Sequence, residues 1–475
     1  MKTVLTLTLP HEISQGPLRY VLSVFCALYC YDFIEDGSAA KAKRIINISY
    51  GSVRTAHFDG PVIIVRQSSY FKHMGEIPED LQRLVASARE AAFQSHTLPI
   101  DSQTAELKTD ILATAFFMLT GAADKFGKID QHGRVLAPRD KLPEGLFDLP
   151  VVNHWFRQLH ELIQQLLGKT VESLSGPHQQ TILLSHDLDR MSRYQGLSGL
   201  RGMASRARSN PMGLIKDFRT FLKVNTNKQR DPYDRIESLF AVKERMQAPS
   251  TWFLLAKRDA RNADYDLNDN RLRTMLPRMK ANGDEIALHG SWASANRASV
   301  LNAEREKLAD ATGREILGNR QHYLRGKLPD IWNASRVAKL QYDSTVAYPD
   351  YNGFRLGWSG VLPTYDLETQ KMSGFYEIPL VCMDVTLANY EKIAPELALE
   401  RITNLLDASC DHIRGGAFVF LWHNIIGDQS QFPGYWDSFE YFFSIASGSA
   451  RFVTARQLCA EYKEICNSSM LPENH

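Results

Sequence analysis

The segment 181–189 constrains the fold of this chain more than any other stretch. Its first four residues are strand-forming and mostly apolar, and they run directly into the sequence Ser-His-Asp-Leu-Asp. The two acids, Asp187 and Asp189, are spaced i and i+2, which places both side chains on one face of an extended strand. A buried parallel strand with acids at its carboxyl end is a common way to build a site in an α/β fold, because one carboxylate can bind a metal while the other accepts a proton. A strand ending in a polar turn, with Asp189 as a helix cap, would give the same pattern.

Length and composition indicate a soluble globular protein of two or three domains. The chain has 475 residues, of which 44% are apolar and 23% charged, and its formal net charge of +1 indicates no nucleic-acid partner. The most apolar run, residues 20–31, is shorter than the roughly 18–20 residues that a transmembrane helix needs. Six cysteines fit no zinc-binding spacing and are expected to be reduced. Together with the lack of a secretion signal, they favour a cytoplasmic location.

Alternating strand and helix patterns divide the chain into two α/β units. Residues 1–150 are expected to form a smaller α/β domain of unknown role, and residues 151–178 a connecting helix and linker. Beyond them, apolar strands alternate with helices of 10–13 residues, the rhythm of parallel βαβ units. This rhythm predicts a closed or nearly closed α/β barrel over residues 179–465, followed by a tail at 466–475.

A basic insertion follows directly after the paired acids. Residues 190–230 contain ten lysines or arginines and a single acid, Asp217. Such a segment is either a solvated surface arm or a mobile lid over an anionic substrate, such as a sugar nucleotide, a lipid-linked sugar diphosphate or an acidic glycan.

Reactive side chains also follow other strands of the expected barrel. They are His289, Arg320, His322, Asp343 and His423. Because parallel strands place their carboxyl ends at one end of a barrel or sheet, several of these side chains are expected to meet the two acids there.

Taken in order, these segments resemble the polysaccharide deacetylases of the NodB-homology type, also called carbohydrate esterase family 4. The resemblance covers about 175–465 and rests on five motifs: 185–189, 288–294, 320–323, 342–344 and 421–423. More narrowly, the chain resembles a bacterial branch associated with surface-polysaccharide gene clusters, in which the deacetylase-like domain follows an uncharacterised α/β region. The resemblance implies a distorted seven-stranded barrel of the deacetylase type.

The resemblance also implies an activity, namely hydrolytic removal of an N-acyl group, most simply N-acetyl, from an amino sugar or glycan precursor. It implies Asp187 as the general base, Arg320 as the residue that holds this base, and His423 as the general acid. The implied metal ligands are Asp189 and His289, and the implied substrate contacts are Ser291, Trp292, Tyr323 and Asp343.

One position departs from the family pattern. A second metal-binding histidine should follow His289 by four residues, where this chain has Ala293, and His322 is expected to supply the missing nitrogen. We therefore expect one divalent metal, zinc first and otherwise cobalt, nickel or manganese, at Asp189, His289 and His322. Two alternatives stay open, a metal-independent hydrolase of a small amide and a degenerate module that binds a glycan or partner without turnover. The sequence does not determine the oligomeric state.

Overall fold

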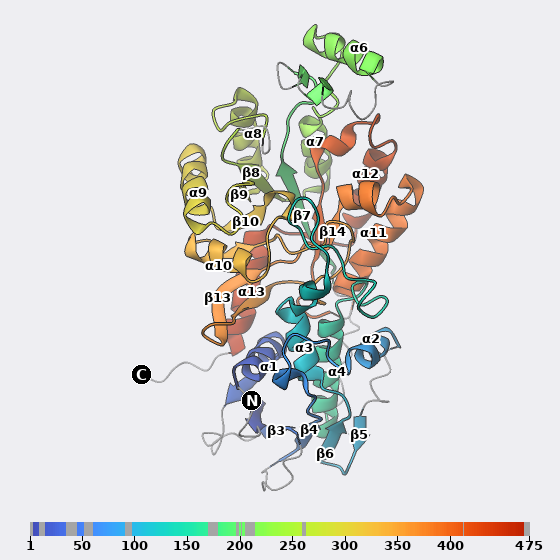
Figure 1. The fold of residues 1–475 in the computed structure, drawn as a ribbon, viewed down its shortest axis with the longest axis vertical. Coiled ribbons are helices and arrows are strands. Elements are labelled where there is room, and N and C mark those ends of the chain that lie inside the picture. Colours follow the sequence, from blue (N-terminus) through green and yellow to red (C-terminus); the bar gives the residue numbers. More distant parts are fainter. Residues whose placement is uncertain are drawn as a thin grey trace.

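A computed structural model gives the fold of the chain (Figure 1). The described residues are 3–8, 15–34, 45–51, 60–90, 97–169, 179–195, 199–200, 202–204, 214–258, 263–411 and 413–469. The expected linker at 170–178 and much of the basic insertion therefore lie outside the described residues. None of the described helices is both long and apolar enough to cross a lipid bilayer.

The first part of the chain forms a smaller α/β region around a six-stranded sheet with the order β2-β1-β3-β4-β6-β5. All neighbouring strands pair in parallel except the edge pair of β5 and β6. The strands are β1 Val4–Thr8, β2 Asp32–Ile34, β3 Ile45–Tyr50, β4 Val62–Val65, β5 Thr97–Pro99 and β6 Thr104–Leu107. The helices are α1 Gln15–Tyr29, α2 Leu81–Glu90, α3 Ile111–Leu119 and α4 Val151–Leu166.

Helix α3 begins where the sequence predicts, because the Asp110 side chain accepts a hydrogen bond from the backbone N–H of Ala113 and so caps the helix. All nine residues of α3 are buried. Such a helix is stabilised by packing on all sides rather than by an amphipathic face, and it sits in the middle of the molecule, between the six-stranded sheet and the second sheet (Figure 1).

The second sheet forms the barrel-type domain and has the order β12-β13-β11-β10-β9-β8-β7-β15-β14, with β16 also paired to β7. Its strands are β7 Thr181–Leu188, β8 Thr251–Leu255, β9 Glu285–Gly290, β10 Gly318–Gln321, β11 Tyr342–Asp343, β12 Leu362–Asp366, β13 Lys371–Glu377, β14 Cys382–Met383, β15 Phe418–Leu421 and β16 Arg451–Phe452. In the described part of the chain no pairing joins β12 to β14, so the sheet curls into an open barrel.

The seven strands expected for this barrel correspond to β7–β11, β14 and β15. The antiparallel β12–β13 hairpin and the short β16 bring the sheet to ten strands. Helices cover its outer face (Figure 1). They are α7 Ile236–Met246, α8 Asn270–Ala281, α9 Ala298–Thr312, α10 Asp330–Val337, α11 Pro395–Cys410, α12 Tyr435–Ala446 and α13 Ala455–Ser469. Because α13 continues to Ser469, residues 466–469 of the expected tail are helical.

The two α/β parts share one continuous hydrophobic core. Tyr20 of α1 donates a hydrogen bond to the carbonyl of Pro363 at 2.9 Å, and its ring lies 4.9 Å from that of Tyr365. Asn153 of α4 accepts a hydrogen bond from the backbone N–H of Ser359. The first part of the chain is thus packed directly against the barrel and fixes the position of the loop that follows α3.

A buried ion pair joins α7 to the start of β9. Lys243 donates to both carboxylate oxygens of Asp284 at 2.7 and 2.6 Å, and both side chains are almost fully buried. Burial lowers the pKa of Lys243 to about 8, although Asp284 acts to raise it. Asp284 also accepts from the backbone N–H of Ser250 and from the indole of Trp252, so this one carboxylate ties together three segments beneath the barrel.

We expect Asp284→Ala to lower the free energy of unfolding by roughly 3–5 kcal/mol, because it leaves the Lys243 ammonium buried without its partner. Urea unfolding followed by circular dichroism measures this loss. The matched control is Glu440→Ala, which breaks a surface pair with Arg245 together with a hydrogen bond from Trp436 and should cost about 1 kcal/mol. An equal effect of the two substitutions would contradict a special role for the buried pair.

Candidate active site

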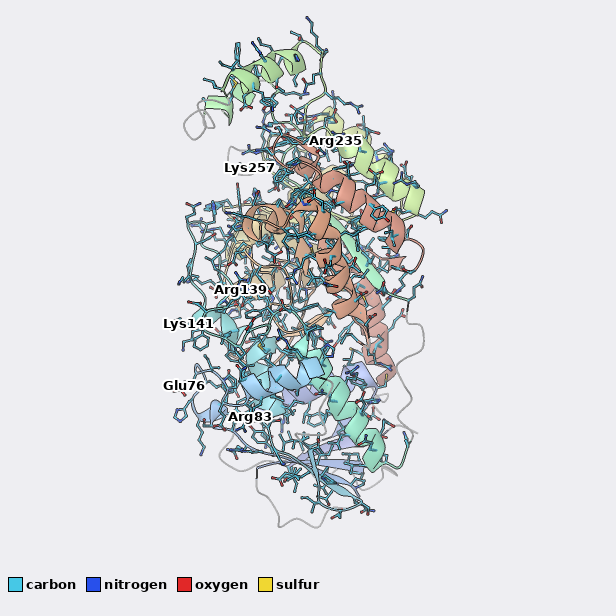
Figure 2. The ribbon with its side chains drawn as sticks, turned by 90° about the vertical axis from the view of Figure 1, so that its right-hand side faces the viewer. Glu76, Arg83, Arg139, Lys141, Arg235 and Lys257 are labelled. Carbon is cyan, nitrogen blue, oxygen red and sulfur yellow. The ribbon has the colours of Figure 1, made fainter. Side chains whose placement is uncertain are left out.

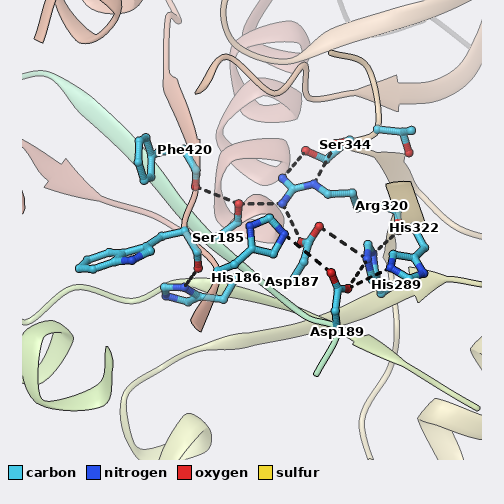
Figure 3. A network of polar contacts seen from close by, with 12 residues as sticks. Ser185, His186, Asp187, Asp189, His289, Arg320, His322, Ser344 and Phe420 are labelled. Atoms are coloured by element: carbon cyan, nitrogen blue, oxygen red, sulfur yellow. Dashed lines mark hydrogen bonds and ion pairs between the residues drawn. The ribbon is translucent and has the colours of Figure 1, made fainter. Parts of the chain in front are cut away.

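The carboxyl ends of β7, β9, β10 and β15 meet at one cavity of about 310 Å³. Six of the predicted site residues line it: Asp187, Asp189, His289, His322, Tyr323 and His423. Figure 3 shows Asp187, Asp189, His289 and His322 turned toward one another, with Arg320 behind Asp187. The i, i+2 spacing of the two acids therefore puts both carboxylates on the same side of β7, as the sequence predicts.

Arg320 holds Asp187 in place. Its Nη1 donates to Asp187 Oδ1 at 3.0 Å and to Ser185 Oγ at 2.8 Å. Its Nε and Nη2 donate to the backbone oxygen and the hydroxyl of Ser344, both at 3.0 Å. The guanidinium is fully buried and lies 4.2 Å from the ring centroid of Phe253. With its N–H groups and its face so occupied, Arg320 fixes the orientation of Asp187 and supplies a compensating charge next to it.

Asp189, His289 and His322 form a cluster suited to a metal. Their ligand atoms all lie within 4.8 Å of one another. Asp189 Oδ1 is 3.1 Å from His289 Nε2 and 3.4 Å from His322 Nε2. The other ring nitrogen of His289, Nδ1, is 2.8 Å from the carbonyl oxygen of Arg320, an arrangement that directs Nε2 toward Asp189.

The donor atoms of this cluster fit a divalent metal. Asp189 Oδ1 is a buried atom that faces the Nε2 atoms of both imidazoles. Two imidazole nitrogens and one carboxylate oxygen make up a three-ligand set typical of catalytic zinc. Ala293, at the position of the missing family histidine, is exposed and does not take part.

The charges in the cluster are strongly coupled. Burial would raise the pKa of Asp189, but His322 and His289 hold this pKa well below its usual range. Burial would likewise lower the pKa of His289, but Asp187 and Asp189 outweigh that effect and raise it. The two carboxylates thus create a strongly negative potential at the imidazoles, which a bound cation would also satisfy.

On the opposite side of the cavity, His423 is oriented by Asp384. The carboxylate lies 2.7 Å from His423 Nδ1 and also accepts the backbone N–H of His423. His423 Nε2 is then directed into the cavity, 4.0 Å from Asp189 Oδ2. Burial lowers the pKa of His423, but Asp384 outweighs it and the resulting pKa is about 9. The imidazole is therefore protonated at neutral pH and available as a proton donor.

Residues from outside the barrel complete the cavity. His132 and Arg134 belong to the loop between α3 and α4, and both line the cavity. His132 stacks on Tyr323 with ring centroids 5.4 Å apart, while Arg134 donates to Tyr390 Oη at 2.7 Å. Tyr323 itself has a positive φ of 63°, an uncommon conformation for a non-glycine residue. The N-terminal part of the chain therefore forms one wall of the site.

Apart from Arg320, three predicted residues lie outside the set that lines the cavity. Ser291 donates to Glu304, and Trp292 packs against Arg325 with the guanidinium 4.5 Å from its ring centroid. Asp343 is fully buried and accepts hydrogen bonds from Asn319 and Ser335. Of the four expected substrate contacts, Tyr323 alone is among the cavity-lining residues that the structure describes.

Asp384, His132, Arg134 and Tyr390 are site residues that sequence reasoning did not identify. A signal existed for Asp384, because the apolar run 378–383 leads directly into this acid, much as the apolar start of β7 leads toward Asp187. The loop residues have no such signal, since neither hydrophobic periodicity nor a motif marks their segment.

Comparisons with known proteins were made for the whole chain. A family of unknown function (DUF7033) matches residues 6–168. No curated protein matches the chain. Among solved structures, a Mycobacterium smegmatis protein provisionally described as a polysaccharide deacetylase is 16% identical, with a TM-score of 0.38, and the match covers 64% of this chain and 96% of that one.

Two further structures give a similar result. The peptidoglycan deacetylase PdaC from Bacillus subtilis is 12% identical, with a TM-score of 0.30, covering 61% of this chain and 94% of its own. A pseudoenzyme of carbohydrate esterase family 4 from Bacillus anthracis is 7% identical, with a TM-score of 0.30, covering 60% and 66%. The solved structures similar to this chain thus include proteins described as deacetylases and one described as a pseudoenzyme.

Proposed function

We propose that the chain is a metal-dependent hydrolase that removes an N-acyl group, most simply acetyl, from an amino sugar or a glycan precursor. The observation that carries this proposal is the convergence of three units on one cavity. These units are the Arg320–Asp187 pair, the Asp189, His289 and His322 cluster, and the Asp384–His423 pair. Together they comprise a candidate base, a candidate metal site and a candidate acid, as amide hydrolysis needs.

Asp189, His289 and His322 would hold the metal, with zinc as the first expectation. When bound, such an ion polarises an acyl carbonyl and lowers the pKa of water toward ~7. Asp187, oriented by Arg320, takes the proton from the attacking water. The backbone N–H of Tyr323, at the edge of the cavity, is the candidate donor to the developing oxyanion. His423 then donates its proton to the departing amine, which could not otherwise leave.

The substrate and its setting belong to the same proposal. A cavity of this size accommodates one sugar residue and its acyl group. Arg190 at its lining suits a substrate that carries an acidic group nearby, whereas the charge of Arg134 is already compensated by Asp130. We also propose surface-polysaccharide biosynthesis as the pathway class and the cytoplasm as the location, in line with the six free cysteines. Residues 1–150 contribute His132 and Arg134 to substrate binding.

The metal content of the protein purified without chelator tests the proposal. We expect about one zinc, cobalt, nickel or manganese ion per chain, lost in Asp189→Ala, His289→Ala and His322→Ala. The matched control is His132→Ala, which removes a cavity histidine outside the cluster and should retain the metal. Metal loss should abolish release of acetate from an N-acetylated amino-sugar oligomer, and reloading should restore it.

The two alternatives predict other results. Acetate release from a protein without metal would favour a metal-independent hydrolase. Tight glycan binding without any acetate release, even after metal reloading, would favour a binding module. Either outcome would overturn the metal-dependent mechanism.

A further inference from the structure

One helix of the basic insertion carries an apolar stripe that faces solvent. Helix α6, Leu214–Asn225, lies at the end of the molecule opposite to the six-stranded sheet (Figure 1). Leu214, Ile215, Phe218 and Leu222 are 39–67% exposed. On a helical projection these four side chains fall within an arc of about 100°, so they form one continuous stripe.

The orientation of α6 is fixed by contacts on its other face. Asp217 accepts a hydrogen bond from Tyr194 Oη at 2.7 Å and lies 3.6 Å from Arg193. Asn225 donates to the carbonyl of Tyr194, and Val224 is buried. Asp217 and Val224 lie about 110° and 130° around the helix from the middle of the stripe, so their contacts leave the four apolar side chains exposed to solvent.

Basic residues border the stripe. Lys216, Arg219 and Lys223 lie along one of its edges, and all three are exposed. Arg235 and Lys257 lie at the same end of the molecule (Figure 2). The whole insertion, 190–230, has ten basic residues against one acid. The described part of this end of the protein thus places exposed apolar side chains of α6 next to exposed basic ones.

We propose that α6 docks on the surface of a bilayer that contains anionic phospholipids. The stripe inserts at the boundary between headgroups and acyl chains, while the bordering lysines and arginines contact lipid phosphates. Charge complementarity favours this occupant over a second copy of the chain, because two copies would bring like charges together. The stripe disfavours a nucleic acid, whose phosphates would leave four apolar side chains in water. The proposal is independent of the hydrolase activity.

Co-sedimentation of the full chain with vesicles tests this inference. We expect binding to phosphatidylglycerol vesicles and much weaker binding to phosphatidylcholine vesicles, with the difference falling as salt is added. Ile215→Ser/Phe218→Ser/Leu222→Ser should lower the partition coefficient at least about tenfold. Lys216→Ser/Arg219→Ser/Lys223→Ser should lower the partition coefficient on phosphatidylglycerol vesicles and leave it unchanged on phosphatidylcholine vesicles. These positions are exposed, so folding should be preserved, and circular dichroism checks that.

The matched control is Val337→Ser/Tyr441→Ser/Ile445→Ser, which removes three equally exposed apolar side chains from α10 and α12. It should bind vesicles as the parent does. Equal loss in the control and in the stripe variant would overturn the inference. Absence of vesicle binding would overturn it as well. A solution dimer that the stripe variant abolishes would also overturn it and would identify a second copy of the chain as the occupant of the stripe.

Discussion

Replacing Asp187 with asparagine is expected to lower kcat for acetate release by at least about a hundredfold. The amide keeps the size of the carboxylate and can still accept a hydrogen bond from Arg320 at the position of Oδ1. It cannot take a proton from water, so the loss should appear in kcat rather than in KM. Steady-state kinetics on an N-acetylated amino-sugar oligomer measures both constants.

Metal content separates this role from that of a ligand. Asp187 Oδ2 lies 3.7 Å from His289 Nε2, close to the metal cluster. If Asp187 is the base, Asp187→Asn retains the metal of the parent protein while activity falls. Loss of metal in the variant would instead reassign Asp187 as a ligand, and full activity would exclude it as the base. Asp264→Asn removes a carboxylate from a neighbouring loop, where Asp264 binds the backbone of Met191, and should change kcat little.

The positions of four barrel strands could be predicted because each is a short and mostly apolar run. Such runs identify β7, β8, β9 and β15 nearly to the residue. The connecting helices are long enough to require parallel pairing, so the sequence also predicts that the strand ends, and hence Asp187, His289 and His423, converge.

The relation of His322 to the metal cluster depends on strand register, which the sequence does not contain. In the structure β10 pairs in parallel with β9 so that Arg320 lies beside His289. His322 follows two residues later, just beyond the end of the strand, and its imidazole comes to 3.4 Å from Asp189. The motif resemblance predicts that His322 replaces the family histidine missing at Ala293. It is the strand register that brings the His322 nitrogen close to Asp189.

The walls of the cavity were not predictable from local patterns. His132 reaches Tyr323 because the first part of the chain packs on the barrel through α1 and α4, contacts between residues more than a hundred positions apart.

Asp343 was predicted as a site residue but lies away from the cavity. Its place at a strand end suggests a site residue, yet its hydrogen bonds to Asn319 and Ser335 turn the carboxylate into the interior. Side-chain direction at a strand end depends on tertiary partners as well as on spacing.

Removing the imidazole in His423→Ala is expected to lower amide hydrolysis by at least about a hundredfold, because the amine must be protonated as it leaves. The same variant should hydrolyse p-nitrophenyl acetate with a much smaller loss, since p-nitrophenolate leaves without a proton. Asp187→Asn should impair both reactions, because both need an activated water. The ratio of amide to ester activity therefore assigns the acid and the base separately.

Asp384 acts through His423 and is a positioning residue. Asp384→Asn keeps the side-chain volume but cannot hold the imidazole in its protonated, inward-facing form, since the carboxylate contacts both His423 Nδ1 and its backbone N–H. Its amide-to-ester ratio should fall in the same direction as that of His423→Ala, with KM unchanged. In the double variant Asp384→Asn/His423→Ala the effects should not add, because the two residues work as one unit. Additive losses, or equal losses on amide and ester, would show that Asp384 merely supports the fold of this end of the barrel and that the proton donor is another group.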